Sequence, residues 1–133
     1  LLSWLISHFL PQLNFIRKPY NNIGIFIFFL GLFSLFWSIY LFKKNKTPVI
    51  PGQKPTFVVA EGPYKFTRNP MYLGVTIALL GASVYIGNLL SLLSPAIFFL
   101  IMNYYFVPFE ERLMEQLFGK KYLNYKKKVR RWI

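Results

Sequence analysis

Two short stretches of the chain carry residues whose types and spacing could do chemistry. The first runs from Glu61 to Gly74 and contains Tyr64, Arg68 and Tyr72 beside two glycines and two prolines. Its Gly-Pro pair favours a turn, and its Asn-Pro pair favours a helix start with the asparagine as N-cap. The free N–H groups of such a helix start attract an anion. This segment is therefore either a rigid capped turn or an anion-binding site.

The second stretch holds two adjacent glutamates, Glu110 and Glu111, directly after a long apolar run. Neighbouring helical residues point about 100° apart, so we expect at most one glutamate to face the interior of a helix bundle. The other would pair with a nearby Lys or Arg. A carboxylate that faces inward near a membrane is a candidate functional group. Two solvated glutamates at the level of the lipid headgroups are the alternative.

Taken together, the two stretches suggest a ligand with an anionic part and a cationic part. The helix start and Arg68 would bind the anion, and a glutamate with aromatic faces can hold a cation such as a sulfonium. S-adenosylmethionine carries a carboxylate, an amine and a sulfonium. The residues alone lead as far as a zwitterionic or cationic cofactor.

Composition excludes several classes of protein. Of 133 residues, 55% are hydrophobic and only 15% are charged, and the mean hydropathy is +0.40. A soluble domain has about 25% charged residues, so a soluble enzyme and a disordered chain are both excluded. Cysteine and aspartate are absent and His8 is the one histidine, which excludes disulfides and a Cys nucleophile and argues against a metal site.

The charges fall between long apolar runs. Residues 1–16, 19–42 and 69–109 contain no Lys, Arg, Asp or Glu, which is typical of a multi-span membrane protein. This placement argues against nucleic-acid binding despite a net charge of +12. We predict a spanning helix over 21–42 and a membrane hairpin of Met71–Ile86 and Leu89–Val107. The hairpin turns at Gly87-Asn88 and has a tolerable kink at Pro95.

Positive charge predicts the orientation. The 43–68 loop holds six Lys or Arg and the tail after residue 107 holds eight, whereas the hairpin tip holds none, so the loop and the C-terminus should be cytoplasmic. Tyr122, Tyr125, Val129 and Trp132 recur at spacings of 3, 4 and 3, which predicts a basic amphipathic helix at anionic lipid headgroups. Some of these aromatic rings could also close a site.

The predicted fold is an all-α membrane protein in a prokaryotic inner or plasma membrane. We expect about four transmembrane helices, including the C-terminal hairpin, and a basic amphipathic C-terminal helix. One domain would comprise N-terminal helices (1–42), a cytoplasmic loop (43–70), the hairpin (71–109) and C-terminal site helices (110–133). Residues 1–10 are either a first span or an interfacial segment. Because the chain begins with Leu, we expect residues to precede it. The sequence indicates no oligomeric state.

The same stretches resemble a known family. The run GPYKFTRNPMYLG over 62–74 resembles the signature of the integral-membrane methyltransferases, which include isoprenylcysteine carboxyl methyltransferase and phospholipid N-methyltransferase. Glu110-Glu111 with the following Leu113, Leu117-Phe118-Gly119, Tyr122 and Tyr125 resembles the tail of that family. Thr47-Pro48-Val49-Ile50-Pro51 looks like a loop motif of bacterial members. The resemblance covers about residues 45–132.

The resemblance implies an enzyme that uses S-adenosylmethionine and a lipophilic acceptor that enters from the bilayer. Its motifs assign cofactor binding to Tyr64, Arg68, Asn69, Tyr72, Gly74, Glu110 and Glu111, with weaker assignments to Tyr122 and Tyr125. Several members have His where this chain has Asn69, so a proton-transfer role at that position is excluded here. Glu110 and Glu111 are the candidate catalytic residues.

The acceptor and two other classes of function stay open at this point. An isoprenylcysteine carboxylate is already ionised, a thiolate needs modest help, and a lipid amine must first lose a proton to one of the two glutamates. A membrane reductase for sterol-like substrates would instead bind NADPH. A membrane scaffold or anchor fits the composition equally well, but it has no need of the glycine- and proline-rich 61–74 segment.

Overall fold

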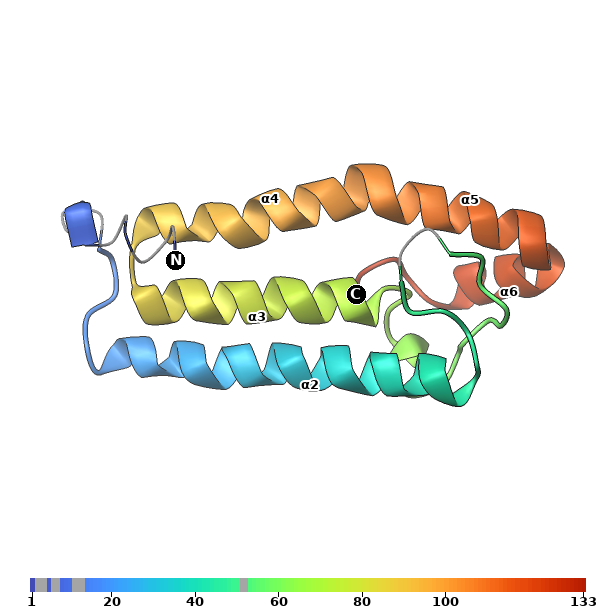
Figure 1. Ribbon diagram of the computed structural model, residues 1–133, viewed down its shortest axis with the longest axis horizontal. Coiled ribbons are helices and arrows are strands. Elements are labelled where there is room, and N and C mark those ends of the chain that lie inside the picture. Colours follow the sequence, from blue (N-terminus) through green and yellow to red (C-terminus); the bar gives the residue numbers. More distant parts are fainter. Residues whose placement is uncertain (2–4, 6–7, 11–13, 51–52) are drawn as a thin grey trace.

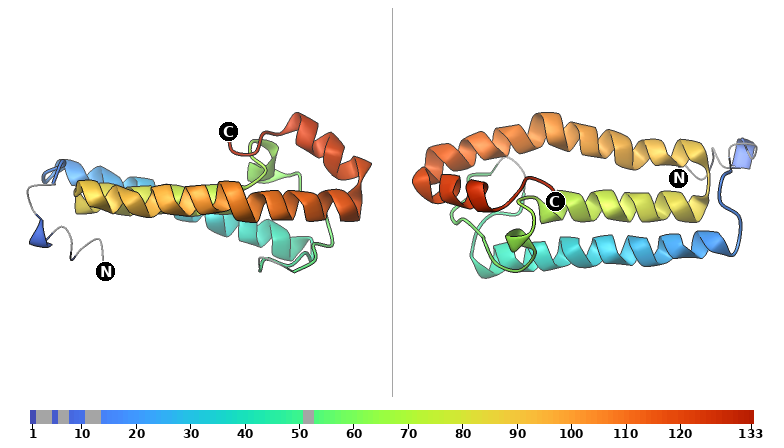
Figure 2. Two further views of the ribbon diagram at one scale, coloured as in Figure 1. Left: turned by 90° about the horizontal axis from the view of Figure 1, so that it is seen from above. Right: turned by 180° about the vertical axis from the view of Figure 1, so that it is seen from behind.

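The computed structural model describes Leu1, Leu5 and residues 8–10, 14–50 and 53–133. Over this part of the chain the regular elements are helical, and one isolated β-bridge joins Asn14 to Asn88. Three rods lie side by side, and the C-terminal helix lies across one end of them (Figures 1 and 2). In chain order the elements are η2 (Tyr20–Asn22), α2 (Ile23–Lys44), η3 (Gly62–Lys65), α3 (Pro70–Ile86), η4 (Leu89–Leu92), α4 (Leu93–Ile101), the π-turn η5 (Met102–Phe106), α5 (Val107–Phe118) and α6 (Lys120–Lys128).

Glycines set the closest contact in the bundle, between α2 and α3. A Cβ atom built on Gly31 would lie 2.4 Å from the carbonyl oxygen of Gly74, and one on Gly81 would lie 2.3 Å from the backbone nitrogen of Phe28. Small residues of this kind let two helix backbones approach in a membrane. This contact fixes the N-terminus of α3, where the motif segment begins its helix, against α2.

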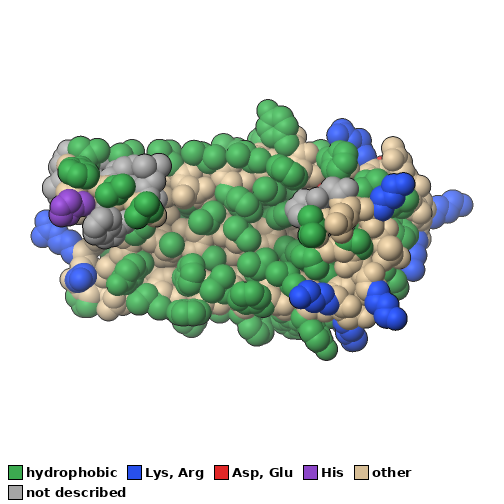
Figure 3. Space-filling model, viewed as in Figure 1, with side chains coloured by type: hydrophobic (Ala, Val, Ile, Leu, Met, Phe, Trp, Pro, Cys, Tyr) green, Lys and Arg blue, Asp and Glu red, His purple; other side chains and the backbone are tan. Residues whose placement is uncertain are grey.

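In the part of the chain that the structure describes, two helices are long and apolar enough to cross a membrane, Tyr20–Lys44 and Leu89–Phe118. Only 17% of the most apolar window of each is buried, whereas the core helix of a soluble protein would be mostly buried. Figure 3 shows hydrophobic side chains over much of the rod surface and Lys and Arg near the two ends. The helix α3, with 17 residues, is apolar but shorter.

The predicted spans and hairpin are found close to their predicted limits. The span over 21–42 corresponds to α2, and the hairpin corresponds to α3 followed by the rod from Leu89. Gly87 ends α3 with a φ of 73°, a left-handed conformation that suits glycine. The side chain of Asn88 accepts a hydrogen bond from the backbone N–H of Leu90, so the predicted turn is built from both residues.

Three details of the prediction need correction. Pro95 lies in the first turn of α4, and the Ser91 carbonyl that precedes it accepts the Ser83 hydroxyl instead, so the proline breaks no helical hydrogen bond. The departure from α geometry comes later, at the π-turn. The C-terminal helix ends at Lys128, and Val129 is extended, so Val129 and Trp132 lie beyond the helix.

Three of the about four predicted spans correspond to helices of the described residues. The described residues contain two candidate spans and the shorter α3, and the question of a span over residues 1–10 lies largely outside the described residues. The bundle therefore supplies two long helices and a short one. The turn from α3 to α4 lies at one end, and the loop from α2 to α3 lies at the other end, together with α6 (Figure 1).

Candidate functional site

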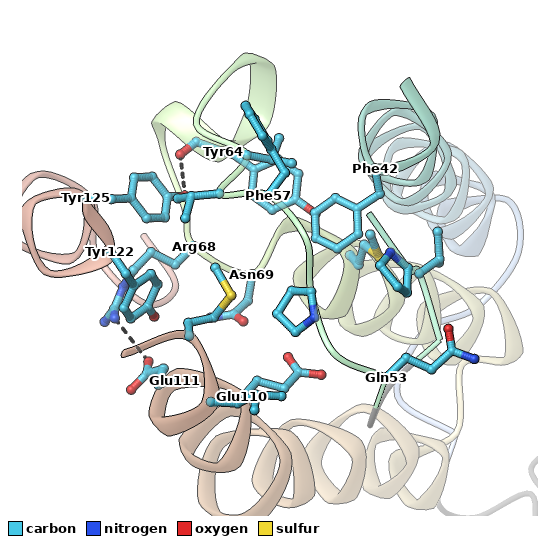
Figure 4. Close-up of a pocket in the computed structure, with 18 of the residues that line it drawn as sticks. Phe42, Gln53, Phe57, Tyr64, Arg68, Asn69, Glu110, Glu111, Tyr122 and Tyr125 are labelled. Atoms are coloured by element: carbon cyan, nitrogen blue, oxygen red, sulfur yellow. Dashed lines mark hydrogen bonds and ion pairs between the residues drawn. The ribbon is translucent and has the colours of Figure 1, made fainter. Parts of the chain in front are cut away.

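A pocket lies at that end, between the N-terminal turn of α3, the start of α5, the helix α6 and the loop after α2. It contains about 890 Å³ of empty space, its open mouth included. Figure 4 shows tyrosines, Arg68 and the two glutamates around it. The lining residues are Phe42, Pro48, Val49, Ile50, Gln53, Pro55, Phe57, Val58, Val59, Tyr64, Arg68, Asn69, Met71, Tyr72, Glu110, Glu111, Leu113, Met114, Tyr122 and Tyr125.

The 3₁₀ turn η3 places Tyr64 in one wall of the pocket. Gly62 opens this turn with a φ of 58°, which suits glycine. Tyr64 is 4% exposed, and its ring stacks on Phe42 with 5.3 Å between ring centroids. The backbone carbonyl oxygen of Tyr64 accepts a hydrogen bond from the Tyr125 hydroxyl at 2.7 Å. Burial raises the pKa of both tyrosines, so their hydroxyls stay protonated at neutral pH.

Arg68 lies at the pocket with buried donors that have no acceptor. Its side chain is 10% exposed, and Nη1 lies 3.1 Å from Oε1 of Glu111. This contact is an ion pair and lacks hydrogen-bond geometry. Nε and Nη1 of Arg68 make no hydrogen bond to a described residue. Buried donors without acceptors cost free energy. The free donors of Arg68 are thus suited to an anionic ligand.

The motif does not show which groups Asn69 and Gly74 contact in the folded protein. Asn69 stands at the N-cap position of α3, but its side chain makes no capping hydrogen bond. Its Nδ2 donates instead to the backbone oxygen of Arg131, in the C-terminal tail, at 3.0 Å. Gly74 does not line the pocket. It packs on α2, where an added Cβ would lie 2.7 Å from the Gly31 oxygen.

The two adjacent glutamates differ in their partners. Glu110 accepts the Tyr72 hydroxyl at 2.5 Å and has no ion pair among the described residues. Glu111 is 8% exposed and accepts two hydrogen bonds of 2.9 Å from Arg131. Both line the pocket, so the expectation that at most one would face inward is wrong. Groups from α3 and from the tail approach α5 on two sides, which accommodates both carboxylates.

The helix α6 and the tail close the remaining side of the pocket. Tyr122 and Tyr125 come from α6 and line the pocket. Burial, with the nearby charge of Glu111, raises the pKa of Tyr122 against the opposing effect of Arg68. The hydrogen bonds from Arg131 to Glu111 raise the pKa of that arginine. The tail therefore adds a fixed positive charge beside an acidic residue of the pocket.

Eight of the nine sequence-predicted site residues line this one pocket, Gly74 being the exception. Sequence reasoning did not find the apolar lining, nor Arg131 and its neighbour Asn103. A signal for Asn103 existed, since it is an amide within the charge-free run 69–109. The apolar lining residues resemble every other apolar residue of the chain, so no signal could separate them.

Comparison with known proteins identifies the family. Residues 20–121 match the phospholipid methyltransferase family. The chain is 29% identical over 115 residues to the protein-S-isoprenylcysteine O-methyltransferase B of Arabidopsis thaliana, which covers 82% of this chain and 56% of that protein. It is 27% identical over 122 residues to the protein-S-isoprenylcysteine O-methyltransferase of Schizosaccharomyces pombe, covering 88% and 50%. The chain thus spans about half the length of these two relatives.

The chain is also similar to a shorter relative and, in fold, to a solved structure. An uncharacterized protein of Haemophilus influenzae is 41% identical over 63 residues, which is 47% of this chain and all of that protein. The structure of the eukaryotic intramembrane Ras methyltransferase, isoprenylcysteine carboxyl methyltransferase, matches with a TM-score of 0.75 at 24% identity, over 98% of this chain and 47% of that one. This likeness extends the agreement to the fold. The chain therefore belongs to the phospholipid methyltransferase family of integral-membrane methyltransferases.

Proposed function

We propose that this protein transfers a methyl group from S-adenosylmethionine to a lipophilic acceptor held in the membrane. The observation that carries the proposal is a pair of oppositely charged side chains at one pocket, each with part of its bonding capacity unused. Arg68 has buried donors without acceptors, and Glu110 is a carboxylate without a cationic partner among the described residues. A ligand that carries a carboxylate and positive charge would satisfy both.

The residues present fit the amino-acid end of S-adenosylmethionine. The guanidinium of Arg68 would hold the carboxylate, since charged hydrogen bonds to Arg are strong and directional. Glu110 and the rings of Tyr122 and Tyr125 would hold the cationic part, because carboxylates and aromatic faces both attract cations. Asn69 would act mainly through the tail, to which its amide is already bonded.

The chain's own residues perform the positioning that methyl transfer needs. When bound, the cofactor supplies a methyl group on a sulfonium, which an acceptor can take by in-line displacement. Holding two reactants in line can supply about 7–11 kcal/mol of the barrier. The protonated tyrosines offer donors rather than competing nucleophiles. This arrangement supports catalysis by alignment of the two reactants.

Glu110 is the better candidate for a proton acceptor than Glu111. Glu111 is engaged by Arg131 through both oxygens, whereas Glu110 meets only the Tyr72 hydroxyl. A lipid amine could lose its proton to Glu110, while an isoprenylcysteine carboxylate needs no base. The family and the two isoprenylcysteine methyltransferases support a lipophilic acceptor of either kind, and a thiol is the third candidate. Purified protein assayed with prenylcysteine, phosphatidylethanolamine and small thiols separates the three.

The charged end of the molecule supports a cytoplasmic site at an anionic membrane surface. Fourteen of the sixteen Lys and Arg lie in residues 43–68 and 112–131, the two segments that surround the pocket. An excess of Lys and Arg marks the cytoplasmic side, and each such charge near anionic lipid contributes about 1 kcal/mol. We place the pocket at the cytoplasmic face of a prokaryotic inner or plasma membrane.

Calorimetric titration of the detergent-purified protein tests the proposed cofactor. We expect saturable binding of S-adenosylmethionine and S-adenosylhomocysteine and none of NADPH. Binding of NADPH alone by folded protein would instead indicate a membrane reductase. A folded protein that binds none of the three would indicate a scaffold or anchor.

A further inference from the structure

The C-terminal tail, residues 129–133, is bonded to three separate parts of the chain, namely the motif segment, the π-turn and α5. We infer that Arg131, held by Asn103, is a positioning residue that occupies Glu111 and thereby keeps Arg68 free to bind the carboxylate of the cofactor. This inference rests on the proposed function. It assigns different tasks to the two glutamates, with Glu111 as an internal counter-ion and Glu110 left to the ligand.

The π-turn presents Asn103 to the tail. Its side-chain oxygen accepts a hydrogen bond of 3.0 Å from the Trp132 indole N–H and one of 3.2 Å from Nη1 of Arg131. The Trp132 ring packs against Phe99 at 4.8 Å between centroids. Turns of this type in an α-helix are frequent at functional sites. Asn103 thus holds Arg131 from the π-turn, with its side-chain oxygen at 3.2 Å and its backbone oxygen at 3.4 Å from Nη1.

The other side of the tail is bonded to the motif segment. The backbone oxygen of Arg131 accepts the Thr67 hydroxyl at 3.1 Å and the Asn69 amide at 3.0 Å. The backbone N–H of Arg68 donates to the Arg130 oxygen at 2.9 Å. The Arg131 guanidinium therefore reaches Glu111 from a backbone that is held on both sides.

Of the two arginines that approach Glu111, Arg131 has the stronger bonding geometry and Arg68 the weaker. Its Nε and Nη2 donate to the two carboxylate oxygens at 2.9 Å each, a two-pronged arrangement that only Arg provides. Arg68 reaches one of those oxygens at 3.1 Å without hydrogen-bond geometry. Lys126 lies 4.0 Å from Glu111 but 2.9 Å from Glu115, so it is engaged elsewhere.

The loss of Arg131 would redirect Glu111. A buried carboxylate that loses its partner turns to the nearest cation, and that cation is Arg68. A two-pronged bond between Glu111 and Arg68 would occupy the donors that a ligand carboxylate needs. Arg131 therefore acts on the cofactor site through Glu111 and need not touch the cofactor.

Binding of two ligands isolates this effect. The first is S-adenosylhomocysteine, and the second is its analogue without the α-carboxylate, and the ratio of their dissociation constants measures how much the protein uses the carboxylate. For the unmodified protein we expect a ratio of roughly 10 to 150, the value for one charged hydrogen bond. In Arg131→Gln we expect the ratio to fall to about 3 or less. The double variant Arg131→Gln/Glu111→Gln should recover most of it.

Two further variants keep the test decisive. Arg130→Gln removes an equal charge from the exposed neighbour in the tail and should leave the ratio unchanged. Asn103→Ala retains Arg131 but removes the Asn103 side-chain oxygen that accepts a hydrogen bond from it, and this variant should lower the ratio severalfold. It replaces Arg131→Gln in the test if Arg131→Gln does not fold. Thermal unfolding of each variant in detergent establishes that the protein is folded before titration.

The outcomes separate the inference from the proposed function. If the unmodified protein binds neither ligand, the proposed function fails and the inference fails with it. If it binds both with the expected ratio and Arg131→Gln keeps that ratio, only the inference is overturned. It is equally overturned if the double variant does not recover the ratio, because the loss would then be a general loosening of the tail.

Discussion

Replacing Gly74 by alanine tests whether this motif glycine binds the cofactor or serves helix packing. The glycine does not line the pocket, and an added Cβ would lie 2.7 Å from the Gly31 oxygen and 2.8 Å from the Leu35 nitrogen. To reach an ordinary contact of about 3.4 Å, α2 and α3 would have to separate by about 0.7 Å. Overpacking of this kind costs about 1–3 kcal/mol, and the helix propensity of alanine returns about 1 kcal/mol at most.

We therefore expect Gly74→Ala to lose about 1–2 kcal/mol of stability while the folded variant binds S-adenosylhomocysteine within about threefold of the original. Thermal unfolding in detergent measures the first quantity and calorimetry the second. Gly31→Ala probes the same contact from α2, outside the pocket, and its Cβ would lie at 2.4 Å, so it should destabilise at least as much. Ala96→Val, at an exposed position of α4, is the control for added volume.

The reasoning would be refuted by a Gly74→Ala variant of unchanged stability that no longer binds the ligand. That result would place the glycine at the cofactor and return it to the role that the family motif implies. Equal destabilisation by Gly31→Ala and Gly74→Ala with normal binding would instead confirm that the motif glycine acts through the α2–α3 contact.

Three other substitutions address the site directly. Arg68→Ala should weaken S-adenosylhomocysteine binding by about 1.5–3 kcal/mol, the value of one charged hydrogen bond. Arg112→Ala, which removes an equal charge at an exposed position, should leave binding unchanged. If the two variants give equal titration curves, Arg68 serves only as one of the positive charges that orient the protein in the membrane. Glu110→Gln should weaken the binding of S-adenosylmethionine, measured by calorimetry, by about tenfold or more, and Glu115→Gln should leave it unchanged. If Glu110→Gln binds with normal affinity, the aromatic rings rather than Glu110 hold the cationic part of the ligand. Tyr125→Phe removes the hydrogen bond to the η3 turn and should cost about 1 kcal/mol of stability, and an unchanged unfolding temperature would contradict this.

Helix positions were predictable from the sequence because long charge-free runs and turn residues determine them. The run 21–42 is α2, and Gly87-Asn88 forms the turn that ends α3. The end of α6 was not predictable in the same way. The 3–4–3 spacing of aromatic residues continues to Trp132, but the tail leaves the helix at Val129 because Thr67, Asn69 and Asn103 offer it hydrogen bonds. Those partners are remote in sequence.

The candidate site was predictable only as far as its charged and aromatic members. Eight of the nine residues predicted from the motifs line one pocket. The spacing of the motifs could not show, however, that Glu110 and Glu111 have different partners. That distinction depends on Arg131, which lies 20 residues away in the chain. Spacing likewise could not show that Gly74 faces α2, since a glycine that permits a close backbone approach looks the same whether the neighbour is a ligand or a helix.

The π-turn at Met102–Phe106 also sets the rotational phase of everything that follows it in the same rod. It accommodates about one residue more than an α-helix of the same length, and one residue corresponds to a rotation of about 100°. Both glutamates lie only one to two turns downstream of it. If the same residues were wound as an unbroken α-helix, Glu110 and Glu111 would be rotated by about 100° away from the pocket. Deletion of one residue within the turn would instead restore α-helical geometry and leave both carboxylates in their present orientation, so the extra residue keeps the two glutamates in phase with the pocket.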